Sequence, residues 1–202
     1  ARHIEIPKGA SSLPETPLGV LKLALRLHRA VELTTPGEKA VRREVVESGP
    51  YDLVVANDAR ALPLAFAAKG DAPLLADMHE WAPEERATVF VWRVLVGPYM
   101  EYLCRTYLPR TTAVTSVSAG LANLYSERYG VTTEGVRNSA SYRTLKPTPV
   151  DPAVIKLVHS GTADAERNIM ELIDAVDRLG DRFSLDLYLL RVPGGHLDEI
   201  AK

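Results

Sequence analysis

Three short apolar runs in this sequence end in polar side chains that could do chemistry. The runs are YDLVVA, APLLADM and VIKLVH, and the residues that follow or close them include Asn57, Asp58, His79, Glu80, Ser160 and Gly161. The runs are short and apolar, and they are bounded by polar residues, which favours strands. In a parallel α/β sheet, ligands bind beyond the carboxyl ends of the strands. We therefore predict that these polar residues contribute to one shared site.

His79 is a lone imidazole between two acidic neighbours, Asp77 and Glu80. Carboxylates on either side can orient an imidazole and shift its pKa, which would suit a catalytic role. A structural histidine that is bonded to the backbone is the alternative. Asn57 and Asp58 could bind a ligand, cap the following helix, or do both.

Gly161 opens a polar segment that reaches Arg167, between an expected strand and an expected helix. Free N–H groups and the dipole at a helix N-terminus attract phosphate, and glycine lets a ligand approach the backbone closely. Arg167 adds a planar cation that suits phosphate oxygens. The segment therefore predicts a phosphate site, with Ser160 and Thr162 beside the glycine. The alternative is an ordinary strand-to-helix turn with a solvated arginine.

Several well-known metal and nucleotide motifs are absent from the sequence. His79 and Glu80 begin like the zinc motif His-Glu-x-x-His, but its last position is occupied by Pro83. No Cys-x-x-Cys and no Asp-x-Asp occurs, and the run SVSAG lacks the first glycine of a nucleophile elbow. Neither Gly-x-Gly-x-x-Gly nor a P-loop is present. We therefore expect neither a metal site nor a cofactor.

The composition is that of an ordinary globular protein, with 46% hydrophobic and 25% charged residues. A formal net charge of −2 gives no electrostatic case for a nucleic-acid partner. The single cysteine, Cys104, excludes an internal disulfide and fits a reducing compartment, and we expect it to be a buried helical residue. No apolar run reaches the roughly 18 residues that span a bilayer. We therefore predict a cytoplasmic protein.

Strand-like runs alternate with helical patterns, which predicts an α/β fold with a parallel sheet. The expected strands cover about 1–7, 52–56, 73–76, 112–117, 134–137, 154–159 and 185–190. The expected helices cover about 18–33, 35–48, 60–69, 84–96, 98–108, 119–129 and 165–179. Thr35 and Glu38 form a capping box, Ser118 is an N-cap and Gly130 is a C′ glycine. We expect the second helix of the 84–108 stretch to start after a break at Gly97-Pro98.

Three prolines without any periodicity indicate a linker at 146–153. We therefore predict a Rossmann-like N-terminal domain at 1–145. The residues at 154–202 then begin a second, incomplete Rossmann-like domain.

Taken in order, five segments resemble the retaining glycosyltransferases of the GT-B fold (family four, also called group one). They are YDLVVANDARALPLA, APLLADMHEW, TAVTSVSAGLANLYSERYG, GVRNSA and VIKLVHSGTADAERNIMELIDAV, within residues 51–179. The resemblance implies two facing Rossmann-like domains with the active site between them. It also implies transfer of a sugar from a nucleotide-diphosphate donor to an acceptor hydroxyl, which is lipid-linked in many enzymes of this fold. The nucleotide sugar would be a substrate, with no cofactor.

The resemblance assigns roles to individual residues. Arg167 stands where the family has a lysine that contacts the donor pyrophosphate, and Thr162 replaces a second cation. His79 matches a histidine near the transferred sugar or the acceptor. Asp58 matches the acidic residue of a His-x-His-Asp-like run, with Asn57 in place of a histidine. On the same grounds Ser160 and Gly161 would line the donor side, and Glu80 and Asn138 the acceptor side of the cleft.

The family's glycine-rich loop would lie before Ala1, and its Glu-x7-Glu motif would lie beyond Lys202. We therefore expect a piece of a longer protein that is inactive by itself. Two alternatives stay open: a non-catalytic family member that binds a nucleotide or a partner enzyme, and a sugar-nucleotide epimerase of the same fold.

Lys22, Arg26 and Arg29 fall at helical spacing within the helix expected at 18–33. A basic amphipathic helix can lie on an anionic membrane, which predicts peripheral membrane contact. The alternative is a surface helix with a solvated basic face.

Overall fold

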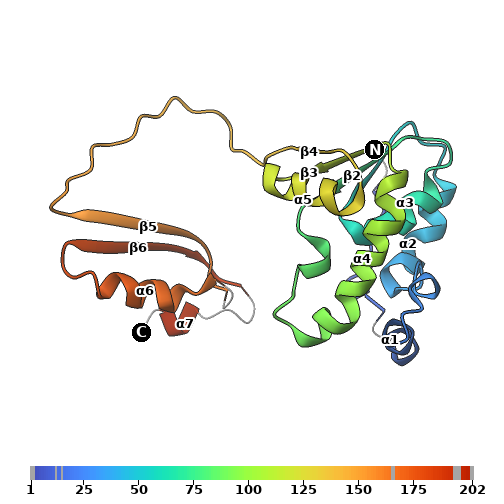
Figure 1. The fold of residues 1–202 in the computed structure, drawn as a ribbon, viewed down its shortest axis with the longest axis horizontal. Helices are drawn as coiled ribbons and strands as arrows, with labels where there is room; N and C mark the ends of the chain where they lie inside the picture. Colours follow the sequence, from blue (N-terminus) through green and yellow to red (C-terminus); the bar gives the residue numbers. More distant parts are fainter. Residues whose placement is uncertain (1–2, 12, 15, 165–166, 193–196, 201–202) are drawn as a thin grey trace. The chain divides into compact units, whose positions relative to one another are not determined.

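The computed structural model describes residues 3–11, 13–14, 16–164, 167–192 and 197–200 (Figure 1). The chain divides into two compact units, Ala1–Ala140 and Ser141–Lys202. The two units are described separately below.

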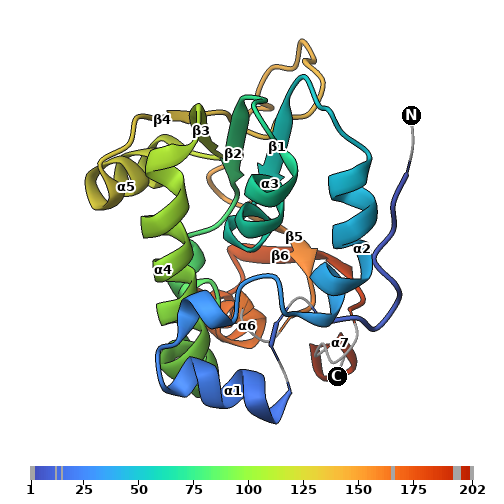
Figure 2. The same ribbon diagram turned by 90° about the vertical axis from the view of Figure 1, so that its right-hand side faces the viewer.

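The first unit is built on a parallel sheet of four strands, so the predicted α/β class is confirmed. The strands are β1 (Val54–Asn57), β2 (Leu74–Met78), β3 (Ala113–Ser116) and β4 (Thr133–Gly135), and they pair in chain order. The α-helices are α1 (Pro17–Ala24), α2 (Pro36–Glu47), α3 (Leu62–Ala68), α4 (Gly97–Tyr107) and α5 (Ala119–Tyr129). Helix α3 packs against β1 and β2, and α5 packs against β3 and β4 (Figure 2).

Short helical turns join these elements. Those of the 3-10 type are η1 (His28–Ala30), η2 (Ala59–Ala61), η3 (Ala82–Glu84) and η5 (Leu108–Arg110), and η4 (Trp92–Val96) is a π-helical turn. The turns η2 and η3 follow β1 and β2 closely, so they shape the carboxyl edge of the sheet.

The sheet has one buried face and one more open face. Ala76 and its register partners in β1 and β3 are at most 3% exposed. The next row of register partners, Asn57, Asp77 and Thr115, lies on the opposite face and is exposed or half-buried. Cys104 of α4 is fully buried in the core, as the sequence predicts. The polar residues at the strand ends therefore sit on the open side.

The local capping signals are confirmed. The Thr35 hydroxyl accepts from the Glu38 N–H, and the Glu38 carboxylate accepts from the Thr35 N–H, so the capping box begins α2. Ser118 caps α5 by accepting from the Leu121 N–H at 3.3 Å. Gly130 ends α5 in the left-handed conformation, with φ of 67°.

The helix expected at 18–33 is shorter than predicted. Helix α1 ends at Ala24, and Arg26 adopts a left-handed conformation with φ of 57°. The Leu27 N–H bonds to the Lys22 carbonyl and the Arg26 N–H to the Leu23 carbonyl, which is the Schellman pattern of a helix end. Glycine usually occupies that position, so an arginine there gives no indication in the sequence that the helix ends. The three cations expected on one helical face therefore do not share a helix.

The break expected at Gly97-Pro98 is also wrong. Pro98 lies in the first turn of α4, where its missing N–H is tolerated, and η4 leads directly into that helix. A strand was expected at residues 1–7. The described residues 3–7 form no strand, because no neighbouring strand pairs with them, and residues 1–2 lie outside the described ranges.

The second unit holds a parallel strand pair, β5 (Ile155–Thr162) and β6 (Phe183–Leu190), with helices α6 (Ile169–Asp177) and α7 (Leu197–Ile200). Strand β5 is longer than expected because β6 pairs with it through Thr162. Helix α6 starts at Ile169 instead of Ala165, and residues 165–166 lie outside the described ranges. Asn168, just before the helix, has φ of 50°.

Within the described ranges, every helix falls short of the length and apolarity needed to cross a membrane.

Candidate functional site at the carboxyl ends of the first three strands

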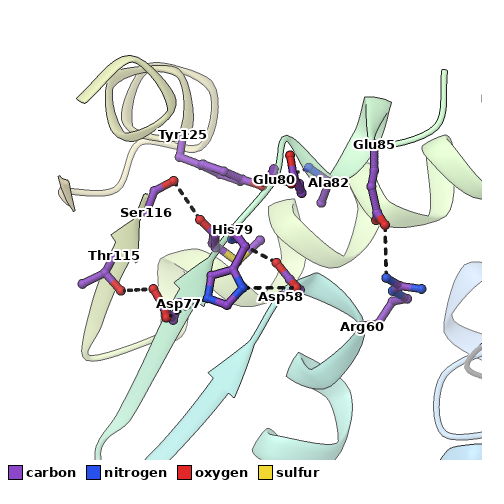
Figure 3. A network of polar contacts seen from close by, with 11 residues as sticks. Asp58, Arg60, Asp77, His79, Glu80, Ala82, Glu85, Thr115, Ser116 and Tyr125 are labelled. Atoms are coloured by element: carbon purple, nitrogen blue, oxygen red, sulfur yellow. Dashed lines mark hydrogen bonds and ion pairs between the residues drawn. The ribbon is translucent and has the colours of Figure 1, made fainter. Parts of the chain in front are cut away.

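Asp58 and His79 meet beyond the ends of β1 and β2 (Figure 3). The Asp58 N–H donates to the Asp77 carbonyl at 2.9 Å, and Asp58 Oδ1 accepts from the His79 N–H at 3.0 Å. Asp58 has φ of 66°, a left-handed value that turns the chain sharply after β1. Because the backbones of the two strands are tied together here, the carboxylate of Asp58 is fixed beside the imidazole.

The imidazole of His79 lies between two carboxylates. Its Nε2 is 3.0 Å from Asp77 Oδ2, and its Nδ1 is 3.9 Å from Asp58 Oδ2. The hydrogen bond with Asp77 raises the pKa of His79 above its ordinary value; partial burial opposes the rise, and the charges of Asp58 and Glu80 add to it. The side chain is 44% exposed, so a ligand can reach it.

Asp77 is held from its other side by Thr115. The Thr115 hydroxyl donates to Asp77 Oδ1 at 2.6 Å, and the two residues are register partners on β2 and β3. The hydrogen bond from Thr115 lowers the pKa of Asp77. Partial burial opposes this change, whereas the hydrogen bond and charge of His79 lower the pKa further. Asp77 is therefore an ionised carboxylate in a fixed position, suited to orienting the histidine.

A buried tyrosine holds the loop that carries the histidine. The Tyr125 hydroxyl donates to the Glu80 carbonyl at 2.6 Å and accepts from the Ala82 N–H at 3.0 Å. The Ser116 hydroxyl donates to the Met78 carbonyl at 2.8 Å. These bonds attach both ends of the 78–82 segment to α5 and β3 (Figure 3).

This arrangement contains the groups that a proton-transfer step requires. With Nε2–H donating to Asp77, the neutral imidazole presents Nδ1 as an acceptor, and Nδ1 lies beyond hydrogen-bond distance of Asp58. A carboxylate that orients a histidine whose other nitrogen faces a substrate is the pattern of a general acid–base pair. The surrounding carboxylates also favour positive charge that develops on a substrate.

The remaining residues expected on the acceptor side lie in different settings. Asn57 is exposed at the end of β1, in the row of Asp77. Glu80 follows His79 with an exposed side chain, and its carbonyl is the group bound by Tyr125. Asn138 is exposed in a segment after β4 that has no helix or strand, and it forms no hydrogen bond with the residues of this site.

The residues expected to bind the donor lie in the second unit, and their local structure differs from the expected turn. Ser160, Gly161 and Thr162 are inside β5, paired with Tyr188 to Leu190 of β6. Arg167 is exposed, and its N–H donates to the Asp164 carbonyl at 3.1 Å. Since α6 begins two residues after Arg167, Gly161 does not open the helix N-terminus.

Two residues of the site, Thr115 and Tyr125, were missed as candidates, and Asp77 was recognised only as an acidic neighbour that could orient His79. Asp77 and Thr115 occupy alternate positions of apolar strands, and only the pairing of β2 with β3 brings them together. Tyr125 fits the apolar pattern of α5, and its two hydroxyl bonds connect residues more than 40 positions apart. For Asp77 and Thr115, the available signal was the alternation of polar with apolar residues in β2 and β3.

No group of three or more His, Cys, Asp or Glu side chains among the described residues is arranged to hold a metal ion.

Neither a comparison with models of known protein families nor one with curated proteins finds a match to this chain.

Proposed function

We propose that this chain is part of a GT-B-type glycosyltransferase that moves a sugar from a nucleotide diphosphate to an acceptor hydroxyl with retention of configuration. The observation that carries the proposal is the His79–Asp77 pair beside Asp58, at the carboxyl edge of a parallel sheet. This edge is where α/β proteins bind substrates. The order of the polar segments along the chain supports the same family.

The carboxylates around His79 suit the chemistry of sugar transfer. Breaking a glycosidic bond to phosphate builds positive charge on the sugar, and Asp58, Asp77 and Glu80 place negative charge around one exposed imidazole. His79 would contact the transferred sugar or the acceptor hydroxyl. The negative charge on the departing diphosphate would need a cation, and Arg167 of the second unit is the proposed group.

A second candidate function is a non-catalytic family member that binds a nucleotide or a partner enzyme. It is favoured by the second unit, where Gly161 lies inside β5 and α6 starts only at Ile169. The glycine therefore does not form a phosphate cradle at a helix N-terminus. Thr162, which stands in place of a cation, also favours the non-catalytic candidate.

Donor binding and turnover separate the two candidates. The complete protein, of which these 202 residues are expected to be a part, is titrated with UDP-glucose, GDP-mannose and the free nucleotides by calorimetry, and release of UDP or GDP is followed by chromatography. We expect binding that Arg167→Ala weakens by about 1.5–3 kcal/mol, as for a charged hydrogen bond. Arg178→Ala, another exposed arginine of this unit, is the control.

Release of nucleotide that His79→Ala abolishes would support the transferase. Nucleotide binding by the complete protein without release of UDP or GDP would favour the non-catalytic candidate. Absence of binding to every nucleotide tested would overturn the transferase and the nucleotide-binding form of the second candidate.

A further inference from the structure

Large apolar side chains are exposed on α1, just after it and just before η4, and these two elements of the first unit contact each other. Six of them are 51–67% exposed: Leu18, Leu21, Leu25, Leu27, Phe90 and Val91. They define what is here named the α1–η4 surface. Isolated apolar residues are normal on any protein surface, whereas several on adjoining segments are a candidate interaction site.

The same two segments are strongly basic. Residues 16–31 and 86–100 contain no Asp or Glu, although the chain as a whole has 26 acidic against 24 basic residues. Their cations are Lys22, Arg26, Arg29, Arg86 and Arg93. None of these five forms an ion pair with a carboxylate that the structure describes. The positive charge of this region is therefore available to a partner.

The two segments are held together as one surface. Arg26 Nη1 donates to the Val94 carbonyl at 2.9 Å, which ties the end of α1 to η4. Figure 2 shows α1 beside the start of the helix formed by η4 and α4. The guanidinium of Arg93 lies 5.8 Å from the centre of the Phe90 ring. Apolar and cationic groups are thus presented side by side.

We propose that the α1–η4 surface docks this protein on an anionic lipid membrane. Aliphatic and aromatic side chains can enter the boundary between headgroups and acyl chains, while nearby Lys and Arg interact with lipid phosphates. Long basic side chains can bury their stems and keep their charges at the headgroups. The proposal needs no basic helix at 18–33, because two separate segments supply the groups, and it stands independently of the proposed function.

Charge favours a membrane over a second copy of the chain. In a two-fold symmetric dimer the same patch faces itself, so the five cations of one copy would oppose the five of the other. Such like charges repel where no carboxylate intervenes. An anionic bilayer supplies both negative charge and an apolar layer, without requiring a matching shape.

Co-sedimentation with vesicles tests the proposal. The 202-residue chain is mixed with vesicles of phosphatidylcholine alone, or of phosphatidylcholine with phosphatidylglycerol, at low and at high salt. We expect binding only to the anionic vesicles, weakened by salt. Leu25→Ser/Phe90→Ser and Arg29→Gln/Arg93→Gln should each lower the partition coefficient about tenfold or more.

Matched controls use other exposed apolar and basic residues of the first unit. Val46→Ser/Leu53→Ser and Lys39→Gln/Arg43→Gln should bind vesicles like the parent. Circular dichroism confirms that each variant is folded before it is compared. Equal sedimentation with neutral and anionic vesicles, or equal losses in the controls, would overturn the proposal. So would a parent dimer, measured by light scattering without lipid, that the α1–η4 substitutions dissociate.

Discussion

Arg26 donates a hydrogen bond to the carbonyl of Val94, with 2.9 Å between Nη1 and the oxygen. Val94 lies four residues before Pro98. In a regular α-helix the Val94 carbonyl would accept a hydrogen bond from the N–H of residue 98, which proline lacks. The guanidinium supplies the missing donor from another segment. The carbonyl that faces the proline is therefore satisfied where η4 leads into α4.

Arg26→Ala should lower the free energy of unfolding by about 1 kcal/mol, because the Val94 carbonyl loses its donor. Urea denaturation followed by circular dichroism measures the change. Arg29→Ala removes an exposed arginine three residues away and should leave stability within about 0.5 kcal/mol of the parent. Equal stability of the two variants would show that the bond contributes nothing.

Asp77→Asn should lower the pKa of His79, because the hydrogen bond with Asp77 is the main cause of its rise. NMR titration of the imidazole protons measures this pKa directly. Asp52→Asn, which removes an exposed carboxylate before β1, should leave the titration curve unchanged. If the pKa of His79 is the same in Asp77→Asn as in the parent, Asp77 does not tune the histidine.

The raised pKa of His79 also predicts how stability depends on pH. The folded protein holds this proton more tightly than the unfolded chain, whose histidine titrates near 6.5. The stabilisation is therefore complete below that value and is lost as pH rises through the raised, folded pKa. Because the side chain is 44% exposed, the effect should be small. Denaturant titrations over this pH window should show a fall in stability that His79→Asn lacks.

Tyr125→Phe should lower the free energy of unfolding by about 2–3 kcal/mol, because two backbone groups of the 80–82 loop lose their partner at a buried position. Thermal and chemical denaturation both report the loss. Tyr142→Phe makes the same chemical change at a residue that is 91% exposed and should be neutral. The His79 resonances should shift in Tyr125→Phe alone if the loop positions the imidazole.

Thr35→Ala should cost about 1–2 kcal/mol, since it removes the cap of α2 at a residue that is 2% exposed. Thr35→Ser keeps the hydroxyl and should recover most of that loss. A serine variant as unstable as the alanine variant would assign the effect to the lost methyl group instead of the cap.

The parts of the fold that the sequence predicted correctly depend on short-range signals. Thr35, Ser118 and Gly130 each satisfy backbone groups within a few residues, so their capping roles can be inferred without knowing the tertiary structure. The strands were recognisable because short apolar runs bounded by polar residues are also a local signal. Burial of Cys104 follows from its place among apolar helical residues.

The errors arose where distant segments decide the local structure. Arg26 ends α1 in a conformation that usually takes glycine, and the Val94 carbonyl, which faces Pro98, takes its donor from Arg26, 68 positions away in the chain. Gly161 was expected at a turn, but pairing with β6 extends β5 past it. Likewise, the sequence places Asp77 near His79, but the hydrogen bond that fixes its carboxylate comes from Thr115 of β3.

The strands of the first sheet pair in the order in which they occur along the chain. Each new strand can therefore add to the edge left by the previous one, without waiting for residues that come much later. Domains generally fold as units during synthesis, starting from the N-terminus. The described side chains that bond to His79 and its loop, among them Asp58, Asp77 and Tyr125, all lie between positions 58 and 125. We therefore expect a ribosome-bound nascent chain to assemble the histidine site before the second unit has been translated.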